Sequence, residues 1–319
     1  QFQLMGINGA FLTGDLFNLF VFFEILLLAS YALLLHGGGR ARSRAGLHYV
    51  IINLLGSALF LLALGILYGL TGTLNMADLA VRIAAASPDD QTLLKGAALL
   101  LMVVFGIKAA ILPLLFWLPR AYSASSAPVA ALFAIMTKVG FYAMVRVLLI
   151  VFGLDPAQPL NAGVFLWLWP LALATLGLGA IGVLGAASLR TMAAYLVIMS
   201  SGLLMASFAM AETTVLAASL FYLLHSTCLA AVFFLLADLI GRLRFALGDR
   251  ASDPSLDFGY AVSGGGGQYG GAAAVLRVYQ QSLAAAKRHR ASALSLDLGY
   301  HTVSRVIHDC RTQPSRLRL

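Results

Sequence analysis

Five ionisable side chains lie inside long apolar stretches of the sequence: Glu24, Lys108, Lys138, Arg146 and His225. A charged group at the middle of a bilayer costs roughly 2.5–3.5 kcal/mol, so such residues usually face other helices or a water path. Proton transfer needs groups in series that can both hold and release a proton, as buried Glu, Lys and His side chains can. A guanidinium stays charged, so Arg146 fits a counter-ion or an anchor. The residue types therefore predict a proton-translocation path through Glu24, Lys108, Lys138 and His225.

The surroundings of the two lysines strengthen this prediction. Lys108 lies five residues before Pro113, and a proline removes a backbone hydrogen bond and kinks or breaks a helix. Lys138 lies two residues before Gly140, which is conformationally flexible. The structural alternative is that Glu24 pairs with a basic neighbour only to hold helices together, and that His225 only hydrogen-bonds a neighbouring side chain.

The elements that must position these residues are long apolar segments. Of the 319 residues 61% are hydrophobic and 11% charged, and the mean hydropathy is +0.90, which disfavours a soluble enzyme, a disordered chain and a secreted disulfide scaffold. Runs of about 20 apolar residues can cross the hydrocarbon layer as helices. Residues 1–241 are therefore expected to form an all-α polytopic transmembrane bundle of about seven helices, near 4–35, 47–70, 93–118, 128–152, 163–185, 190–211 and 215–240.

The distribution of charge predicts the topology. Ten of the 21 Lys and Arg residues lie in 1–241 and eleven in the remaining 78 residues. In the bundle the basic residues lie mostly between apolar runs, a membrane pattern that disfavours nucleic-acid binding. Seven basic residues on one set of loops against two on the other place the N-terminus outside and the C-terminal tail in the cytoplasm. The tail, 242–319, is polar and basic, and is expected to be either disordered or translated out of frame.

Polar and aromatic residues near the ends of the runs have simpler roles. Trp117 and Tyr122 are expected to lie in the aromatic belt at the membrane interface. Asp238 lies near the end of its run and is expected to be interfacial. Asn53, Ser57 and Thr137 could offer oxygen ligands to a cation, but such residues also commonly join helices.

Motifs for other kinds of chemistry are missing. The sequence contains no P-loop, no dinucleotide fingerprint, and no cysteine or histidine pairs with iron–sulfur or haem spacing. The two cysteines, Cys228 and Cys310, lack metal-ligand spacing. We therefore expect no catalytic residues, no cofactor and no bound metal. The energy that drives transport must then come from an ion gradient or from another subunit.

Several motifs resemble those of one family of membrane proteins. They are GAFLTGDLFNLF at 9–20 followed by Glu24, NLLGSALF at 53–60, YGLTGTLNMADL at 68–79, FWLPRAY at 116–122, APV at 127–129, and the stretch 225–238. Together they resemble the antiporter-like membrane subunits: the D-type subunits of Mrp-type multisubunit monovalent cation/proton antiporters, and the related proton-pumping subunits of respiratory complex I. The similarity covers about residues 1–241.

This resemblance implies roles for the buried residues. Glu24 and Lys108 would form a charge-coupled pair, and Lys108, Lys138 and His225 would pass protons across the middle of the membrane. It also implies that the chain corresponds to about the fifth through eleventh of fourteen helices. The chain would then be a fragment, with the polar tail in place of the next helix. A frameshift near 242–245 would explain that change.

The sequence thus predicts a multi-pass subunit of a Na⁺ or K⁺/proton antiporter in a bacterial-type plasma membrane, in contact with lipid and with other membrane subunits of the same complex. The first alternative is a proton-pumping subunit of respiratory complex I, an NADH-quinone oxidoreductase, or of a membrane hydrogenase. The second is a truncated product that does not transport. Under the first alternative the chain would be part of an enzyme, a proton-translocating NADH-quinone oxidoreductase.

Overall fold

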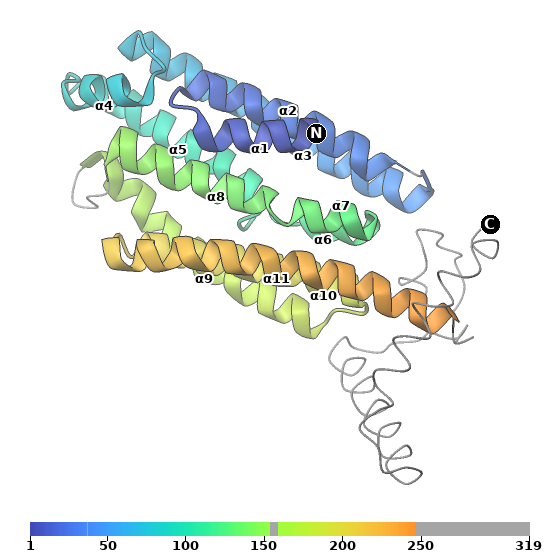
Figure 1. The fold of residues 1–319 in the computed structure, drawn as a ribbon. Coiled ribbons are helices and arrows are strands. Elements are labelled where there is room, and N and C mark those ends of the chain that lie inside the picture. Colours follow the sequence, from blue (N-terminus) through green and yellow to red (C-terminus); the bar gives the residue numbers. More distant parts are fainter. Residues whose placement is uncertain (37, 154–158, 247–319) are drawn as a thin grey trace. The chain divides into compact units, whose positions relative to one another are not determined.

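A computed structural model describes residues 1–36, 38–153 and 159–246 of the chain (Figure 1). The chain divides into two units, 1–272 and 273–319, and every described residue belongs to the first. The tail predicted for 242–319 lies outside the described residues from 247 onward, as does Cys310.

The described part of the chain is helical. Its elements are α1 (Phe2–Leu12), α2 (Leu16–Leu35), α3 (Arg40–Thr71), α4 (Met76–Ala84), α5 (Gln91–Ala109), α6 (Trp117–Ala124), α7 (Ala127–Phe133), α8 (Met136–Val147), a π-helical turn (Leu148–Phe152), α9 (Pro159–Leu184), α10 (Leu189–Ala209) and α11 (Thr213–Ala246). Seven segments of this part are long and apolar enough to cross a membrane. The predicted all-α transmembrane bundle is confirmed.

Three of the seven expected runs are divided in the structure. The run at 4–35 forms α1 and α2, the run at 93–118 forms α5 and the start of α6, and the run at 128–152 forms α7, α8 and the π-helical turn. The first division follows from a helix cap: the Asp15 carboxylate accepts hydrogen bonds from the backbone N–H groups of Phe17 and Asn18, at 2.8 and 2.9 Å, and so starts α2.

The short helix α4 starts in the same way, because the Asn75 side chain accepts hydrogen bonds from the backbone N–H groups of Ala77 and Asp78. The two capping segments also pair with each other. Leu16 N–H donates to the Leu74 carbonyl, and Met76 N–H donates to the Gly14 carbonyl, both at 2.9 Å. These bonds tie the start of α2 to the segment between α3 and α4.

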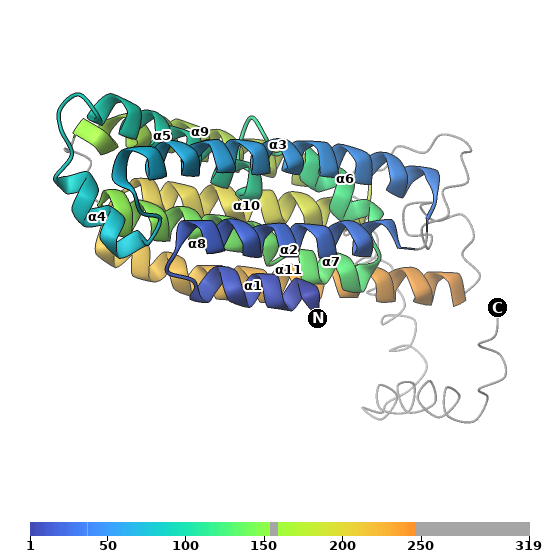
Figure 2. The same ribbon diagram turned by 90° about the horizontal axis from the view of Figure 1, so that it is seen from above.

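The long helices lie nearly parallel in both views (Figures 1 and 2). Helix α5 packs against α3, α8 and α9, and α10 packs against α6, α8, α9 and α11. The span 127–152, which contains α7 and α8, is 72% buried, whereas the spans in α9 and α11 are 22% and 28% buried. The core of the bundle therefore lies around α5, α8 and α10.

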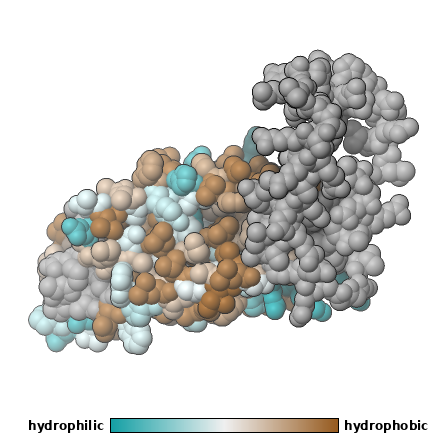
Figure 3. Space-filling model, turned by 90° about the horizontal axis from the view of Figure 1, so that it is seen from below, coloured by the Kyte–Doolittle hydropathy of each residue, from teal (hydrophilic) through white to brown (hydrophobic). Residues whose placement is uncertain are grey.

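Apolar side chains also cover the outside of the bundle. Figure 3 shows brown, hydrophobic residues along the visible face of the described helices. Large exposed hydrophobic side chains occur on helices far apart in the sequence, including Leu54, Ile181 and Phe221. An exterior of this kind suits contact with lipid or with other membrane helices rather than with water.

Candidate functional site

Lys108 lies where α5 stops inside the bundle. The last residue of α5 is Ala109, and Ala110 adopts a left-handed conformation with φ 56°. The next helix, α6, begins only at Trp117. A proline ring clashes with the carbonyl four residues earlier, and for Pro113 that carbonyl belongs to Ala109. The break that the sequence marks at Pro113 therefore begins at the residue next to Lys108.

Neighbouring side chains satisfy the backbone groups around this break. Thr175 of α9 accepts a hydrogen bond from the backbone N–H of Leu112 at 2.9 Å. The Trp117 indole N–H donates to the Ile107 carbonyl at 3.2 Å. Irregular backbone at membrane depth is tolerated where protein provides such partners. Trp117 is 1% exposed, so the expectation that it lies in an interfacial belt was wrong.

The Lys108 ammonium group is enclosed and makes no hydrogen bond within the described part of the chain. Its Nζ lies 5.7 Å from the centre of the Phe23 ring, within the range of a cation–π contact. Phe23 directly precedes Glu24 on α2. The two charges are thus in the same part of the bundle.

Glu24 itself is half-buried and accepts a hydrogen bond from the Ser57 hydroxyl of α3. The ion pairs found among the described residues join Arg82 to Asp78 and Arg190 to Asp238, and neither involves Glu24 or Lys108. Glu24 and Lys108 are therefore neighbours that are not bonded to each other in this arrangement.

Lys138 lies in the first turn of α8, just after the break between α7 and α8, and is fully buried. Its Nζ is 3.5 Å from the Val197 carbonyl and 3.5 Å from the Ser201 hydroxyl, both on α10. These contacts are at the long limit for hydrogen bonds. The ammonium group is thus held loosely between α8 and α10.

Gly140 brings the two lysine-bearing helices together. A Cβ atom at Gly140 would lie 2.7 Å from both the backbone nitrogen of Ala109 and the carbonyl carbon of Lys108. Only a glycine permits so close an approach without a shift of backbone. The start of α8 therefore packs directly on the end of α5, beside Lys108.

His225 stands apart from the other three predicted residues. It lies on α11, and its side chain is exposed on the outside of the described bundle. The structure therefore brings Glu24, Lys108 and Lys138 into the region around α2, α5 and α8, and places His225 outside it.

Arg146 joins two helices of the bundle. Its guanidinium donates to the carbonyl of Phe11, near the end of α1, at 2.8 Å, and the Tyr142 hydroxyl donates to the same carbonyl at 3.2 Å. Cationic side chains stabilise helix C-termini in this way. These bonds attach α1 to α8.

The ion pair between α10 and α11 was not anticipated. Arg190 at the start of α10 and Asp238 of α11 form an ion pair of 2.9 Å, and their side chains are 6% and 14% exposed. The expectation that Asp238 is interfacial overlooked this partner. The signal in the sequence was the placement of opposite charges on the same predicted side of the membrane.

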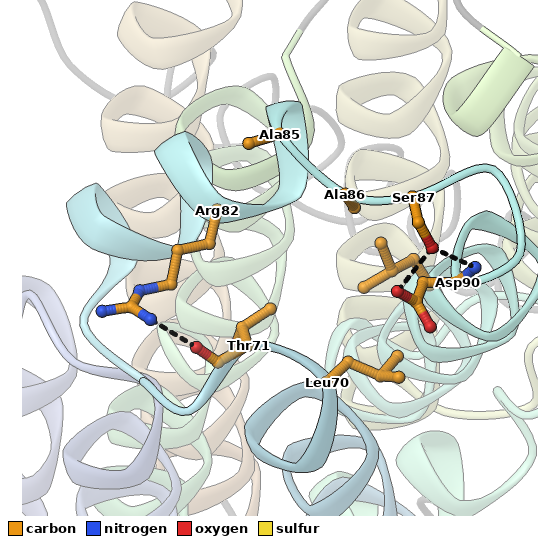
Figure 4. A pocket seen from close by; sticks show the side chains of 8 residues that line it. Leu70, Thr71, Arg82, Ala85, Ala86, Ser87 and Asp90 are labelled. Atoms are coloured by element: carbon orange, nitrogen blue, oxygen red, sulfur yellow. Dashed lines mark hydrogen bonds between the residues drawn. The ribbon is translucent and has the colours of Figure 1, made fainter.

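A cavity of about 280 Å³ lies at one end of the bundle, between α3, α4 and α5 (Figure 4). Its polar groups bond to one another: Arg82 donates to the Thr71 carbonyl at 3.0 Å, and Ser87 donates to Asp90 at 2.7 Å. Leu94, which also lines it, is fourteen residues from Lys108, roughly 20 Å along α5. The cavity is therefore separate from the lysines.

Within the described residues no group of three or more His, Cys, Asp or Glu side chains is placed to hold a metal.

Comparisons with known proteins show which family the sequence is similar to. The family model described as "NADH:quinone oxidoreductase/Mrp antiporter, TM" matches residues 13–246. A protein of Rhizobium meliloti, named as a probable K⁺/H⁺ antiporter D subunit, is 49% identical over 250 residues, which cover 78% of this chain and 46% of that protein. The Na⁺/H⁺ antiporter D subunit of Bacillus subtilis is 42% identical over 239 residues, or 74% of this chain and 47% of that one. The chain thus spans about half the length of these relatives.

Solved structures show the same similarity. A chain in the Mrp complex from Dietzia sp. superposes with a TM-score of 0.66 at 34% identity, covering 73% of this chain and 43% of that one. A chain of respiratory complex I from Thermus thermophilus superposes with a TM-score of 0.63 at 26% identity, covering 74% of this chain and 48% of that one.

Proposed function

Because this chain belongs to the NADH:quinone oxidoreductase/Mrp antiporter transmembrane family, we propose that it serves as the D-type subunit of a multisubunit Na⁺ or K⁺/proton antiporter. The relatives at 49% and 42% identity are named as D subunits of such antiporters. The observation that carries the proposal is the enclosure of Lys108 and Lys138 at helix breaks on two helices that touch at Gly140. Protons would pass along this pair.

Glu24 would modulate the binding and release of a proton at Lys108. A carboxylate next to Lys108 stabilises the charged lysine when it is ionised and nearby, and ceases to do so when it is protonated or turned away. Lys108 lies beside the ring of Phe23, the residue before Glu24, while the Glu24 carboxylate is bonded to Ser57. Proton movement at one residue would therefore change proton affinity at the other.

Transfer between the lysines would run through water. The side-chain oxygens of Thr137 and Ser200 are buried and have no hydrogen-bond partner within the described residues. They are the sequence neighbours of Lys138 and of Ser201, which contacts it. Buried polar groups of this kind are commonly satisfied by ordered water, which supports a hydrated path beside Lys138.

His225 would continue the path at the outer face of α11, where another helix of the assembly would cover it. The chain would work with other membrane subunits, in a bacterial-type plasma membrane, with its N-terminus outside and its tail in the cytoplasm. The exchanged ions would be protons and a monovalent cation.

The similarity to a respiratory complex I chain supports a second candidate, a proton-pumping subunit coupled to redox chemistry elsewhere. The higher identity to the antiporter subunits favours the first. The two differ in what drives transport. An antiporter moves protons when a pulse of Na⁺ or K⁺ alone is added to vesicles, whereas a redox pump requires NADH or another electron donor.

The test is a Lys108→Ala variant in the complete complex, assayed in inside-out vesicles with a pH-sensitive dye and a cation pulse. We expect proton-coupled exchange to fall to background while the assembled complex remains at normal abundance. Lys95→Ala is the matched control, because Lys95 lies near the start of the same helix, and it should retain exchange. Normal exchange in Lys108→Ala vesicles would refute the proposal.

A further inference from the structure

Ser57 occupies the place where α2, α3 and α5 meet. Its hydroxyl donates to the Glu24 carboxylate, and its Oγ also lies 3.1 Å from the Asn53 carbonyl, one turn earlier in α3. The neighbouring residue, Gly56, packs α3 on α5: a Cβ atom there would lie 3.3 Å from the Ile107 side chain, next to Lys108. Ser57 is 5% exposed, so it meets Glu24 in the interior.

The two acceptors make the contact with Glu24 reversible. A serine hydroxyl has one proton and can donate it fully to one acceptor at a time. If Glu24 turns away, the hydroxyl can donate to Asn53, a bond that serines commonly make within helices. Releasing Glu24 therefore leaves no buried hydroxyl donor unsatisfied, and this removes the main cost of breaking a buried hydrogen bond.

Lys108 is the competing partner. Its Nζ makes no hydrogen bond among the described residues and faces the Phe23 ring at 5.7 Å. Glu24 follows Phe23 on α2 and is bonded to Ser57 instead. The structure thus shows the carboxylate held by the neutral hydroxyl while the lysine beside it is unbonded.

We propose that Ser57 is a positioning residue that competes with Lys108 for the Glu24 carboxylate and holds the pair open. In this open arrangement Lys108 is free to exchange its proton with the path towards Lys138. When Ser57 returns to Asn53, Glu24 is released to pair with Lys108 and the lysine is held charged. The inference rests on the proposed function, because it assigns Ser57 a part in the same proton path.

The test measures cation-driven proton exchange of the Ser57→Ala variant in the complete complex. Without the hydroxyl, Glu24 should remain with Lys108, and the maximal rate should fall about tenfold, the factor that one hydrogen bond to a charged group typically provides. The cation concentration at half-maximal rate should not change. Ser57→Thr retains the hydroxyl and should restore the rate to within about twofold.

Ser30→Ala is the matched control. Ser30 is a fully buried serine of α2 whose hydroxyl bonds to Tyr49 and to the Leu27 carbonyl rather than to Glu24. It should retain the wild-type rate. A Ser57→Ala variant with the wild-type rate, or one that slows exchange no more than Ser30→Ala, would overturn the proposal.

A double-mutant cycle shows whether Ser57 acts through Glu24. Glu24→Asp shortens the side chain by one methylene and withdraws the carboxylate from Ser57. Adding Ser57→Ala to Glu24→Asp should then slow exchange less than about twofold, because the effects of substitutions at two interacting residues are not additive. An equal loss in both backgrounds would mean that Ser57 acts elsewhere.

The same series separates this inference from the proposed function. If Glu24→Gln retains full exchange, Glu24 is outside the path and the function assigned to it fails together with the role of Ser57. If Glu24→Gln abolishes exchange while Ser57→Ala retains the wild-type rate, only the role of Ser57 is refuted.

Discussion

The central helices α5 and α8 differ from the peripheral helices α9 and α11 in how they are built around polar groups. Both central helices are next to an interruption, and each carries an enclosed lysine there. Helix α9 runs from Pro159 to Leu184 without interruption, although it contains Pro170. Helix α11 is continuous over 34 residues, and its histidine, His225, faces outwards.

Pro113 shows how an interruption inside the bundle is tolerated. Around Pro113 the freed backbone groups bond to Thr175 and Trp117. An unsatisfied backbone group inside a membrane costs several kcal/mol, so a break persists where neighbouring side chains provide partners. The interruption beside Lys108 therefore lies where neighbouring side chains provide partners for its backbone groups.

The largest predicted effect follows from this difference. Lys138→Ala in the complete complex should reduce cation-driven proton exchange more than about 100-fold, the lower range for loss of a proton-transfer group. The vesicle assay with a pH-sensitive dye measures it, with complex abundance checked by immunoblot. Should exchange persist at even a tenth of the normal rate, the central lysines would not form one path.

Gly140→Ala tests the contact between the central helices. The added methyl would meet the backbone of Lys108 and Ala109, so we expect destabilisation of about 1–3 kcal/mol, typical of overpacking, and a lower exchange rate. The change is measured as a lower melting temperature of the purified complex. Gly65→Ala in α3 is the control, because a Cβ there meets nothing within 4 Å and should leave the complex as stable as the wild type.

His225→Ala tests whether the peripheral helix α11 contributes to proton exchange. If the relay continues to α11, exchange should fall, but less than in Lys138→Ala, because a side chain of the neighbouring subunit or a water molecule between the two can replace the imidazole. The same vesicle assay measures the rate. A loss as large as that of Lys138→Ala would show that centre and periphery contribute equally.

The transmembrane helices and the central lysines could be predicted because both depend on local patterns. Runs of about 20 apolar residues determine which segments span the membrane, and a charge inside such a run is conspicuous. Lys108 and Lys138 therefore stand out without any knowledge of their neighbours. The division at Asp15 has a local signal as well, since an aspartate before an apolar run is a common helix cap.

Contacts between helices could not be predicted from one sequence. Trp117 lies near the end of an apolar run, but in the structure it is buried and its indole N–H donates to the Ile107 carbonyl, ten residues earlier. Asp238 pairs with Arg190, 48 residues away. The sequence predicts Ser57 either as a contact between helices or as a cation ligand. Its hydrogen bond to Glu24 depends on the packing of α3 against α2, which the sequence does not show.

The smallest predicted effect concerns the attachment of α1 to the central helix α8. Tyr142→Phe removes the hydroxyl that donates to the Phe11 carbonyl, but Arg146 still donates to that carbonyl at 2.8 Å. The ring contact between Phe11 and Tyr142, 4.7 Å between centres, is retained by phenylalanine. The loss of stability should therefore be no more than about 0.5–1.5 kcal/mol, and exchange should be normal.

Arg146→Leu in the Tyr142→Phe background would leave the Phe11 carbonyl without either donor. The combined loss of stability should exceed the sum of the single losses, because the second change leaves a partly buried acceptor unpaired. Thermal unfolding of the purified complex measures all three variants, with Tyr195→Phe in α10 as the control for loss of a hydroxyl elsewhere. Additive losses would mean that the two donors contribute independently rather than through one shared carbonyl.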